Sequence, residues 1–112
     1  MDVVPGSNFR KPPVAEKVCA ELLKALADEI RLKILHSLFD REKCVGDLMQ
    51  ELQLAQPHVS HHLKVLKTAR LVDSCRQGHK ICYALHPEVR KRLSPAGRET
   101  LDLGCCEVLF KQ

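Results

Sequence analysis

Residues 54–71, LAQPHVSHHLKVLKTARL, constrain the fold more than any other stretch of the chain. Val59, Leu63 and Leu66 repeat at i, i+4 and i+7, which is the spacing of a buried helical stripe. Pro57 stands where the first turn of a helix tolerates a proline. The stretch therefore predicts one helix that packs on a domain through its apolar stripe.

The opposite face of this helix is polar and basic. His58, His61 and Lys64 point away from the stripe, with Ser60 and Lys67 on its flank. A DNA major groove is about 12 Å wide and admits an α-helix. An ordinary amphipathic surface helix would show the same pattern, so the segments around it have to decide between the two interpretations.

The segments before this helix are also helical. Periodic apolar residues predict a helix over 14–27, and Asp28 is a typical N-cap for a second helix that runs to about residue 39. A third, short helix is expected over 45–52, followed by a tight connection at 53–56. Two short helices joined by so brief a turn indicate a helix-turn-helix.

After residue 71 the pattern changes from helical to alternating. Residues 71–76 and 80–85 read as two strands that are joined by a turn containing Gly78. The hairpin tip carries Arg76, His79 and Lys80, and a basic hairpin directly after a helix-turn-helix is a wing. We therefore predict a mostly α (α+β) winged helix-turn-helix with about five helices and a two-stranded β-wing.

The two ends of the chain are less regular. Residues 1–13 contain three prolines and predict a flexible arm, and residues 14–112 form a single domain with a C-terminal dimerisation and sensor segment. We expect helix over 86–93 and again over 96–103, with a break at Ser94-Pro95. Gly104 could then end a helix, and 107–110 could be a strand or a further turn.

Composition narrows the class of function. The 112 residues carry a net charge of +4, which suits a polyanionic partner, and four aromatics without tryptophan argue against base stacking on single strands. No apolar run approaches the roughly 20 residues of a membrane span, and no signal segment is visible. We therefore expect a cytoplasmic protein whose six cysteines are reduced thiols, and a homodimer, because the core is small.

The sequence resembles the ArsR/SmtB family of bacterial metal-sensing repressors. The resemblance lies in ELLKALADEIRLKILHSL at 21–38, VGDLMQEL at 45–52, QPHVSHHLKVLKTARLV at 56–72 and the wing ending in Tyr83. It covers about residues 15–85. It implies a homodimer that binds an operator with two-fold symmetry in double-stranded DNA and leaves it when an inducer binds.

Two positions depart from the family pattern. Where the family often has serine before the Gln-Pro pair, this chain has Ala55, so that Gln56 would serve as a weaker cap. Where the family commonly has glycine before the wing, this chain has Arg70. A non-glycine residue is then expected to hold a left-handed conformation there, at some cost in free energy.

The resemblance also implies roles for individual residues in binding DNA. Base edges would be read by the recognition helix, and charged side chains on its flank and on the wing would contact phosphate. No catalytic triad spacing, glycine-rich phosphate loop or paired acid cleft is visible, so we do not expect an enzyme. The expected readers are Gln56, His58, Ser60, His61 and Lys64, and the phosphate contacts are Lys67, Arg76 and Lys80.

The family's usual metal motifs are incomplete in this chain. Many members begin the third helix with Cys-Val-Cys-Asp-Leu, whereas residues 44–48 read Cys-Val-Gly-Asp-Leu. Cys44 still lies at a helix N-terminus, where the helix dipole favours thiolate. Zinc sensors of the family use paired Asp and His ligands near the C-terminus, and this chain has no histidine after Pro87. That absence argues against this type of zinc site.

The best candidate for a sensor is the adjacent pair Cys105-Cys106. Some family members that respond to arsenite or antimonite place a cysteine pair near the C-terminus, and a trivalent metalloid takes three thiolates. The third would be Cys44 or Cys19, from either subunit, or a small thiol. All-sulfur ligation also suits cadmium, lead or copper(I). The ion would act as inducer and is not expected to be required for folding.

Other interpretations of the thiols and histidines stay open. The chain could be a thiol redox or persulfide sensor of the same fold, or a DNA-binding dimer without any small-molecule input. Cys75 and Cys82 lie on opposite strands of the wing, directly facing if the turn is Gly78-His79 and diagonal if it is Gln77-Gly78. They could form a redox switch or simply be two small side chains. His58 and His62, at i and i+4, could hold zinc, but DNA needs the same face.

Overall fold

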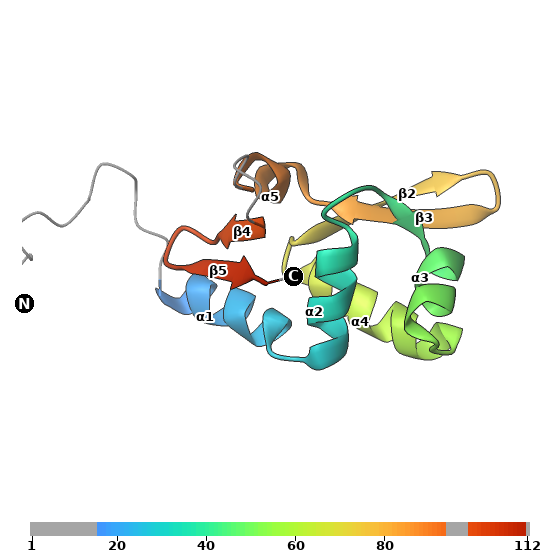
Figure 1. Cartoon of the computed structure of the whole chain (residues 1–112), viewed down its shortest axis with the longest axis horizontal. Coiled ribbons are helices and arrows are strands. Elements are labelled where there is room, and N and C mark those ends of the chain that lie inside the picture. The colour runs from blue at the N-terminus through green and yellow to red at the C-terminus, as the bar shows by residue number, and fades with distance from the viewer. Residues whose placement is uncertain (1–15, 94–98, 112) are drawn as a thin grey trace, which may run out of the picture.

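The computed structural model describes residues 16–93 and 99–111, arranged as a helical body with a projecting hairpin. Figure 1 shows the β2–β3 hairpin at one end of the molecule, near α3, and the β4–β5 hairpin towards the other end, above α1. The helices are α1 (Glu16–Leu26), α2 (Glu29–Ser37), α3 (Val45–Leu52), α4 (Gln56–Thr68) and α5 (Pro87–Lys91). The strands are β1 (Lys43–Cys44), β2 (Val72–Gln77), β3 (Lys80–Leu85), β4 (Glu99–Asp102) and β5 (Glu107–Phe110).

The corner between α1 and α2 is set by Asp28. Its Oδ1 accepts hydrogen bonds from the backbone N–H groups of Ile30 at 2.8 Å and Arg31 at 3.1 Å. These bonds satisfy two donors that the first turn of a helix leaves without an intrahelical partner. The expected N-cap is confirmed, and α2 begins at the next residue.

The two positions that depart from the family pattern lie at the two ends of α4. Ala55 is the N-cap and makes no side-chain capping bond, so the expectation that Gln56 would cap the helix is wrong: Gln56 is the first helical residue. The helix ends at Thr68 with Ala69 as C-cap, and Arg70, the next residue, holds the left-handed conformation with φ 64°, as expected. The N–H of Arg70 donates to the carbonyl of Lys67, and that of Leu71 to the carbonyl of Leu66. This pattern is a Schellman motif.

The wing is a three-stranded antiparallel sheet in the order β1-β3-β2. The sequence predicted two of these strands but not β1, whose two residues are too few to show an alternating pattern. Gln77 pairs with Lys80, so the turn is Gly78-His79, with Gly78 at φ 65°. In this register Cys75 and Cys82 face each other directly.

The C-terminal region differs from the prediction. Instead of a helix over 96–103, residues 99–102 form β4, which pairs antiparallel with β5. The tight turn at Gly104, with φ 92°, allows the chain to reverse at once, and Leu101 bridges to Leu93. Pairing of the two strands satisfies the backbone hydrogen bonds that a helix would otherwise have supplied. The strand alternative for 107–110 is the one found.

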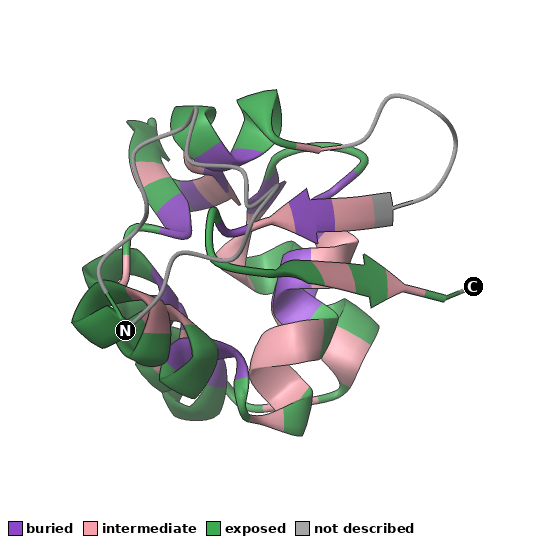
Figure 2. Ribbon diagram, turned by 90° about the vertical axis from the view of Figure 1, so that its left-hand side faces the viewer, coloured by how far each residue is buried: buried purple, intermediate pink, exposed green. Residues whose placement is uncertain are grey.

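The core lies where α1, α2, α3 and α4 meet the base of the wing and the C-terminal hairpin. Figure 2 shows buried residues on the inward sides of the helices and of one C-terminal strand, and exposed residues outside. No helix among residues 16–93 and 99–111 is long and apolar enough to cross a membrane. The expected arm, 1–13, lies outside the described residues. The fully buried large side chains include Ile34, Leu35, Leu38, Leu48, Val59, Leu63, Leu66, Leu71, Val72 and Leu101.

Candidate DNA-binding surface and cysteine site

The recognition helix α4 has the two faces that the sequence predicted. Val59, Leu63 and Leu66 are completely buried and pack on the rest of the core. The predicted DNA contacts on α4 and the wing are all exposed: Gln56, His58, Ser60, His61, Lys64, Lys67, Arg76 and Lys80. Because the apolar stripe fixes the helix on the domain, the opposite face is presented to solvent as a unit.

The start of α3, the start of α4 and the wing tip line one hollow. A cavity of about 360 Å³ is bordered by Cys44, Gly46, Gln56, His79 and Lys80, among other residues. Lys67 lies near the C-terminal end of α4, where its Nζ donates to the Ser74 hydroxyl of β2 at 2.7 Å. This hydrogen bond connects the end of the recognition helix to the wing, so a basic side chain expected on phosphate also braces the two parts.

His62 connects the recognition helix to the α1–α2 corner. Its Nδ1 lies 3.2 Å from the Arg31 guanidinium and 3.8 Å from the Asp28 carboxylate. Burial lowers the pKa of His62 below its usual value, and the neighbouring Asp28 opposes this shift. The backbone N–H of Arg31, which donates to Asp28, lowers the pKa of that carboxyl. His62 is thus engaged in the contact between α2 and α4 through Arg31 and Asp28.

A buried lysine in the α2–α3 region was not anticipated from the sequence. Lys43 is 8% exposed, and its Nζ donates to Ser37 Oγ at 2.6 Å and to Glu51 at 2.9 Å. The hydrogen bonds from Ser37 and Lys43 lower the pKa of Glu51. A lysine in a charged stretch normally predicts exposure, and only the pairing of β1 with the wing turns this side chain inwards.

Three cysteines that are far apart in the sequence meet between α1 and the C-terminal hairpin. The Sγ atoms of Cys19, Cys105 and Cys106 all lie within 4.8 Å of one another. Cys19 comes from α1, and the adjacent pair lies in the turn between β4 and β5. Cys44 is not part of this group, because it is bonded to Cys82 within the sheet of the wing. The structure therefore brings Cys19, and not Cys44, to the predicted pair.

The expectation that all six cysteines are free thiols is wrong. Cys19 is bonded to Cys105, with their Cα atoms 6.3 Å apart, and Cys44 is bonded to Cys82. The physical reason is proximity: α1 lies against the C-terminal hairpin, and Cys44 and Cys82 are partners in the β1–β3 ladder. Cys75 and Cys106 are the free and exposed cysteines of the described chain. Three thiolates can bind one ion at the Cys19 cluster only after the Cys19–Cys105 bond is reduced.

The fold and its exposed basic helix define a winged helix-turn-helix, a class of DNA-binding domain. Residues 28–74 match the family model described as "Bacterial regulatory protein, arsR family". The chain belongs to the ArsR family, as the resemblance predicted, and its relatives are named as transcriptional regulators and not as enzymes.

Individual relatives agree with this assignment. The chain is 42% identical over 80 residues to the HTH-type transcriptional repressor SmtB of Mycobacterium tuberculosis, a match that covers 70% of this chain and 59% of that protein. It is 40% identical to the arsenical resistance operon repressor of Staphylococcus xylosus, with 64% and 69% covered. This chain thus matches only about three-fifths of the SmtB repressor's length.

A solved structure shows the same fold. The homodimeric winged helix-turn-helix DNA-binding domain Mb0332 of Mycobacterium bovis superimposes with a TM-score of 0.65 at 29% sequence identity. The superposition covers 80% of this chain and 82% of that domain. The predicted winged helix-turn-helix is therefore confirmed by architecture and by comparison.

Proposed function

We propose that the chain is a homodimeric transcriptional repressor that binds operator DNA in the cytoplasm. In this proposal it releases the operator when a trivalent metalloid or another soft ion binds thiolates of Cys19, Cys105 and Cys106. The observation that carries the proposal is the meeting of three sulfur atoms within 4.8 Å, in a chain of a metal-responsive family. The relative from Staphylococcus xylosus is named for arsenical resistance, which supports arsenite or antimonite as inducer.

The proposed DNA contact rests on the exposed face of α4 and on the wing. Gln56 can pair with adenine, and serine or histidine can reach several base edges. Lys67, Arg76 and Lys80 supply charge for phosphates, which positions the protein without specifying sequence. Two subunits would place their recognition helices about one DNA turn apart, roughly 34–36 Å, or a multiple of that.

The proposed dimer is supported by apolar side chains that the single chain leaves exposed. Val18 and Leu23 of α1 are 48% and 43% exposed, and Leu109 of β5 is 46% exposed. Large exposed apolar side chains on neighbouring elements are typical of an interface. The homodimeric relative from Mycobacterium bovis supports the same assembly. Leu23→Glu is expected to give a monomer in analytical ultracentrifugation.

The ligand chemistry of the cluster follows from its donors. Three thiolates without oxygen or nitrogen ligands favour soft ions, such as trivalent arsenic or antimony, cadmium, lead or copper(I). Reduction of the Cys19–Cys105 bond supplies two of the thiols, and Cys106 supplies the third. Because Cys19 belongs to α1 and the pair to the hairpin, an ion would join two elements that carry the proposed dimer surface.

The test is a titration of the operator complex under reducing conditions. A duplex from the region upstream of the protein's own gene is labelled, and fluorescence anisotropy is followed as arsenite, antimonite, cadmium, zinc or a persulfide is added. We expect release by arsenite or antimonite at near one ion per subunit. Near-ultraviolet absorption from sulfur–metal charge transfer would report binding independently of DNA.

Cys106→Ser has a matched control in Cys75→Ser, because both are free and exposed cysteines. Cys106→Ser should abolish release and leave DNA binding intact, whereas Cys75→Ser should still respond to the metalloid. A fully responsive Cys106→Ser variant would contradict the site. Release by oxidant or persulfide alone would instead favour the redox alternative, and no binding to the duplex would contradict the repressor proposal itself.

A further inference from the structure

The wing contains a row of three cysteines that crosses all three of its strands. Cys44 of β1 is the ladder partner of Cys82 in β3, and Cys82 is also the ladder partner of Cys75 in β2. Directly opposite residues of antiparallel strands point to the same face of a sheet. The three side chains therefore lie side by side on one face, with Cys82 in the middle.

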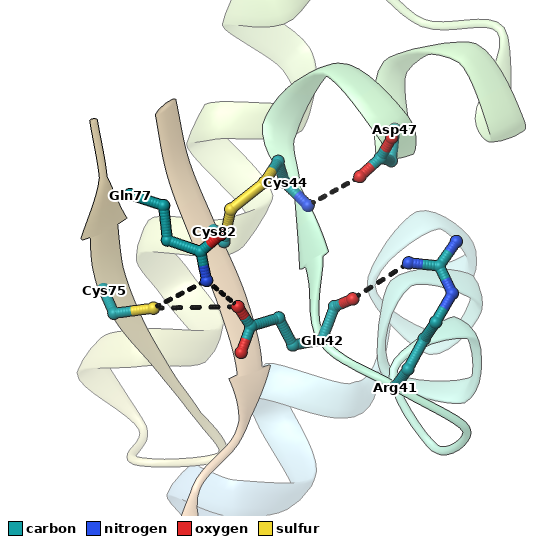
Figure 3. Close-up of a disulfide and its surroundings, with 7 residues drawn as sticks. All are labelled: Arg41, Glu42, Cys44, Asp47, Cys75, Gln77 and Cys82. Atoms are coloured by element: carbon teal, nitrogen blue, oxygen red, sulfur yellow. Dashed lines mark hydrogen bonds between the residues drawn. A yellow bond between two sulfur atoms is a disulfide. The ribbon is translucent and has the colours of Figure 1, made fainter. Parts of the chain in front are cut away.

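The three cysteines of this row are in different chemical states. Cys82 is fully buried and bonded to Cys44, whereas Cys75 is a free and exposed thiol. Figure 3 shows the disulfide between β1 and β3, with Cys75 on the next strand and Glu42 close to it. The Cys75 thiol lies 3.9 Å from the Glu42 carboxylate, and the Gln77 amide, which also donates to Glu42, lies 3.9 Å from the Cys75 sulfur. These contacts hold Cys75 at the edge of the row.

The position of the bond gives it a structural consequence. Cys44 is the N-cap of α3, the first helix of the helix-turn-helix, and Cys82 is in the central strand of the wing. The Cys44–Cys82 bond therefore ties the helix-turn-helix to the wing. A bond between Cys75 and Cys82 would join only the two strands of the hairpin and leave α3 free of it.

We propose that Cys44, Cys82 and Cys75 form a thiol–disulfide exchange site that locks the wing onto the helix-turn-helix or releases it. In the exchange, the Cys75 thiolate attacks Cys82 Sγ. The Cys75–Cys82 bond forms, the Cys44–Cys82 bond breaks, and Cys44 leaves as a thiolate. Cys75 gives its proton to solvent and Cys44 takes one up, so the step needs no oxidant or reductant.

The leaving group lies at a favourable place for this chemistry. Cys44 precedes α3, whose N-terminal dipole stabilises negative charge on the departing sulfur. Full release of the lock is a two-electron reduction by a dithiol, which is itself oxidised to a disulfide. Formation of the lock is the reverse reaction: the thiols of Cys44 and Cys82 are oxidised and pass two electrons to a small-molecule disulfide, such as glutathione disulfide. That disulfide is reduced to two thiols.

The covalent part of the proposal can be tested without DNA. The purified full chain is equilibrated in buffers of glutathione and glutathione disulfide, quenched by alkylation and digested with trypsin. Trypsin places each cysteine of the row in a separate peptide, 44–64, 71–76 or 81–90, so each disulfide gives its own linked mass. We expect Cys44–Cys82 as the main link of the wild-type chain.

Variants then distinguish a row of three exchanging cysteines from an isolated Cys44–Cys82 disulfide. Cys44→Ser should form the Cys75–Cys82 link, because Cys82 keeps its second neighbour. Cys82→Ala should form neither link, because Cys44 and Cys75 are not adjacent in the row. Cys106→Ser, which alters a free cysteine elsewhere, should leave the wing links unchanged.

The alkylation pattern of Cys44→Ser can refute the proposal. If Cys44→Ser leaves both Cys75 and Cys82 alkylated in every buffer, no exchange partner exists and the proposal fails. Circular dichroism spectra and thermal melts of each variant show whether it folds. Should Cys44→Ser not fold, the same mapping on Cys44→Ala, and a time course of Cys75–Cys82 formation in the wild-type chain, decide the question instead.

The regulatory part rests on the proposed DNA binding and has its own readout. In a Cys19→Ser background, which removes the other disulfide, the locked and reduced forms are compared on the duplex from upstream of the gene. A wing held in place loses less freedom on binding, so we expect the dissociation constant to rise at least threefold on reduction. An unchanged dissociation constant would overturn the regulatory part of the proposal. Absence of binding in both forms would contradict the repressor proposal, and the thiol–disulfide exchange would then be tested by the peptide map alone.

Discussion

Replacing Arg70 with glycine is expected to stabilise the protein. Arg70 directly follows the C-cap of the recognition helix and has φ 64°, in the left-handed region that is unfavourable for a residue with a side chain. The Arg70 N–H makes one of the two hydrogen bonds of the Schellman motif and the Leu71 N–H makes the other, and glycine at position 70 keeps both bonds without the steric cost. The substitution therefore changes strain at one residue and keeps the helix end.

The magnitude follows from two opposing contributions. The left-handed conformation costs a residue with a Cβ roughly 1–2 kcal/mol. Glycine loses more backbone entropy on folding than arginine does, and this loss lowers the gain in stability by about 0.5–1 kcal/mol. The net gain is about 0.5–1 kcal/mol in the free energy of unfolding. At about 2.1 cal/mol/K per residue, a chain of 112 residues gains about 2–4 °C in melting temperature.

Thermal and urea unfolding followed by circular dichroism would measure this gain at a fixed thiol/disulfide ratio. Two controls separate backbone from side chain. Arg70→Ala removes the same charge but keeps a Cβ, so it should bring no gain. Ala69→Gly alters the preceding residue, which has φ −80°, and should lower stability. If Arg70→Gly proves no more stable than Arg70→Ala, the argument from backbone strain is wrong.

Three further predictions concern the core, pH and DNA. Leu63→Ala empties a completely buried site on α4 and should lower the free energy of unfolding by about 2–5 kcal/mol in urea titrations; a loss under about 1 kcal/mol would contradict the assigned burial. The pKa of His62 is below its usual 6.5, so its unfolded state binds more protons: stability should fall as pH drops below 6.5, and His62→Gln should remove that part of the pH profile, whereas identical profiles would refute it. Lys80→Ala on the exposed wing should reduce the slope of log K against log salt for DNA by about 0.9, and an unchanged slope would exclude a phosphate contact there.

The regular part of the fold could be predicted because its signals are local. The 3.6-residue periodicity placed four helices, Asp28 marked the start of α2, and alternation around Gly78 marked the wing. The strain at Arg70 was predictable because the family pattern showed glycine there. Each of these features is decided within a few neighbouring residues.

The features that were missed depend on contacts between distant segments. The two residues of β1 are too short for any periodic signal, and they determine both the burial of Lys43 and the partner of Cys82. The four-residue strands β4 and β5 alternate too briefly to be told from a helix end. The cysteine pair at 105–106 was found from its adjacency, but only the packing of α1 against the C-terminal hairpin brings Cys19 to it.

The junction between α4 and β2 has a consequence for engineering this protein. Only three residues, 69–71, separate the helix from the strand, and Leu71 is buried at their end. Added length at this base would tilt the hairpin away from the helix. At the far end, nothing lies within 4 Å of a side chain built at Gly78, but the φ of +65° disfavours any side chain at that residue itself. Fluorescent labels or short inserted loops therefore belong at exposed tip positions beside Gly78, such as His79, where they leave the length of the junction at 69–71 unchanged.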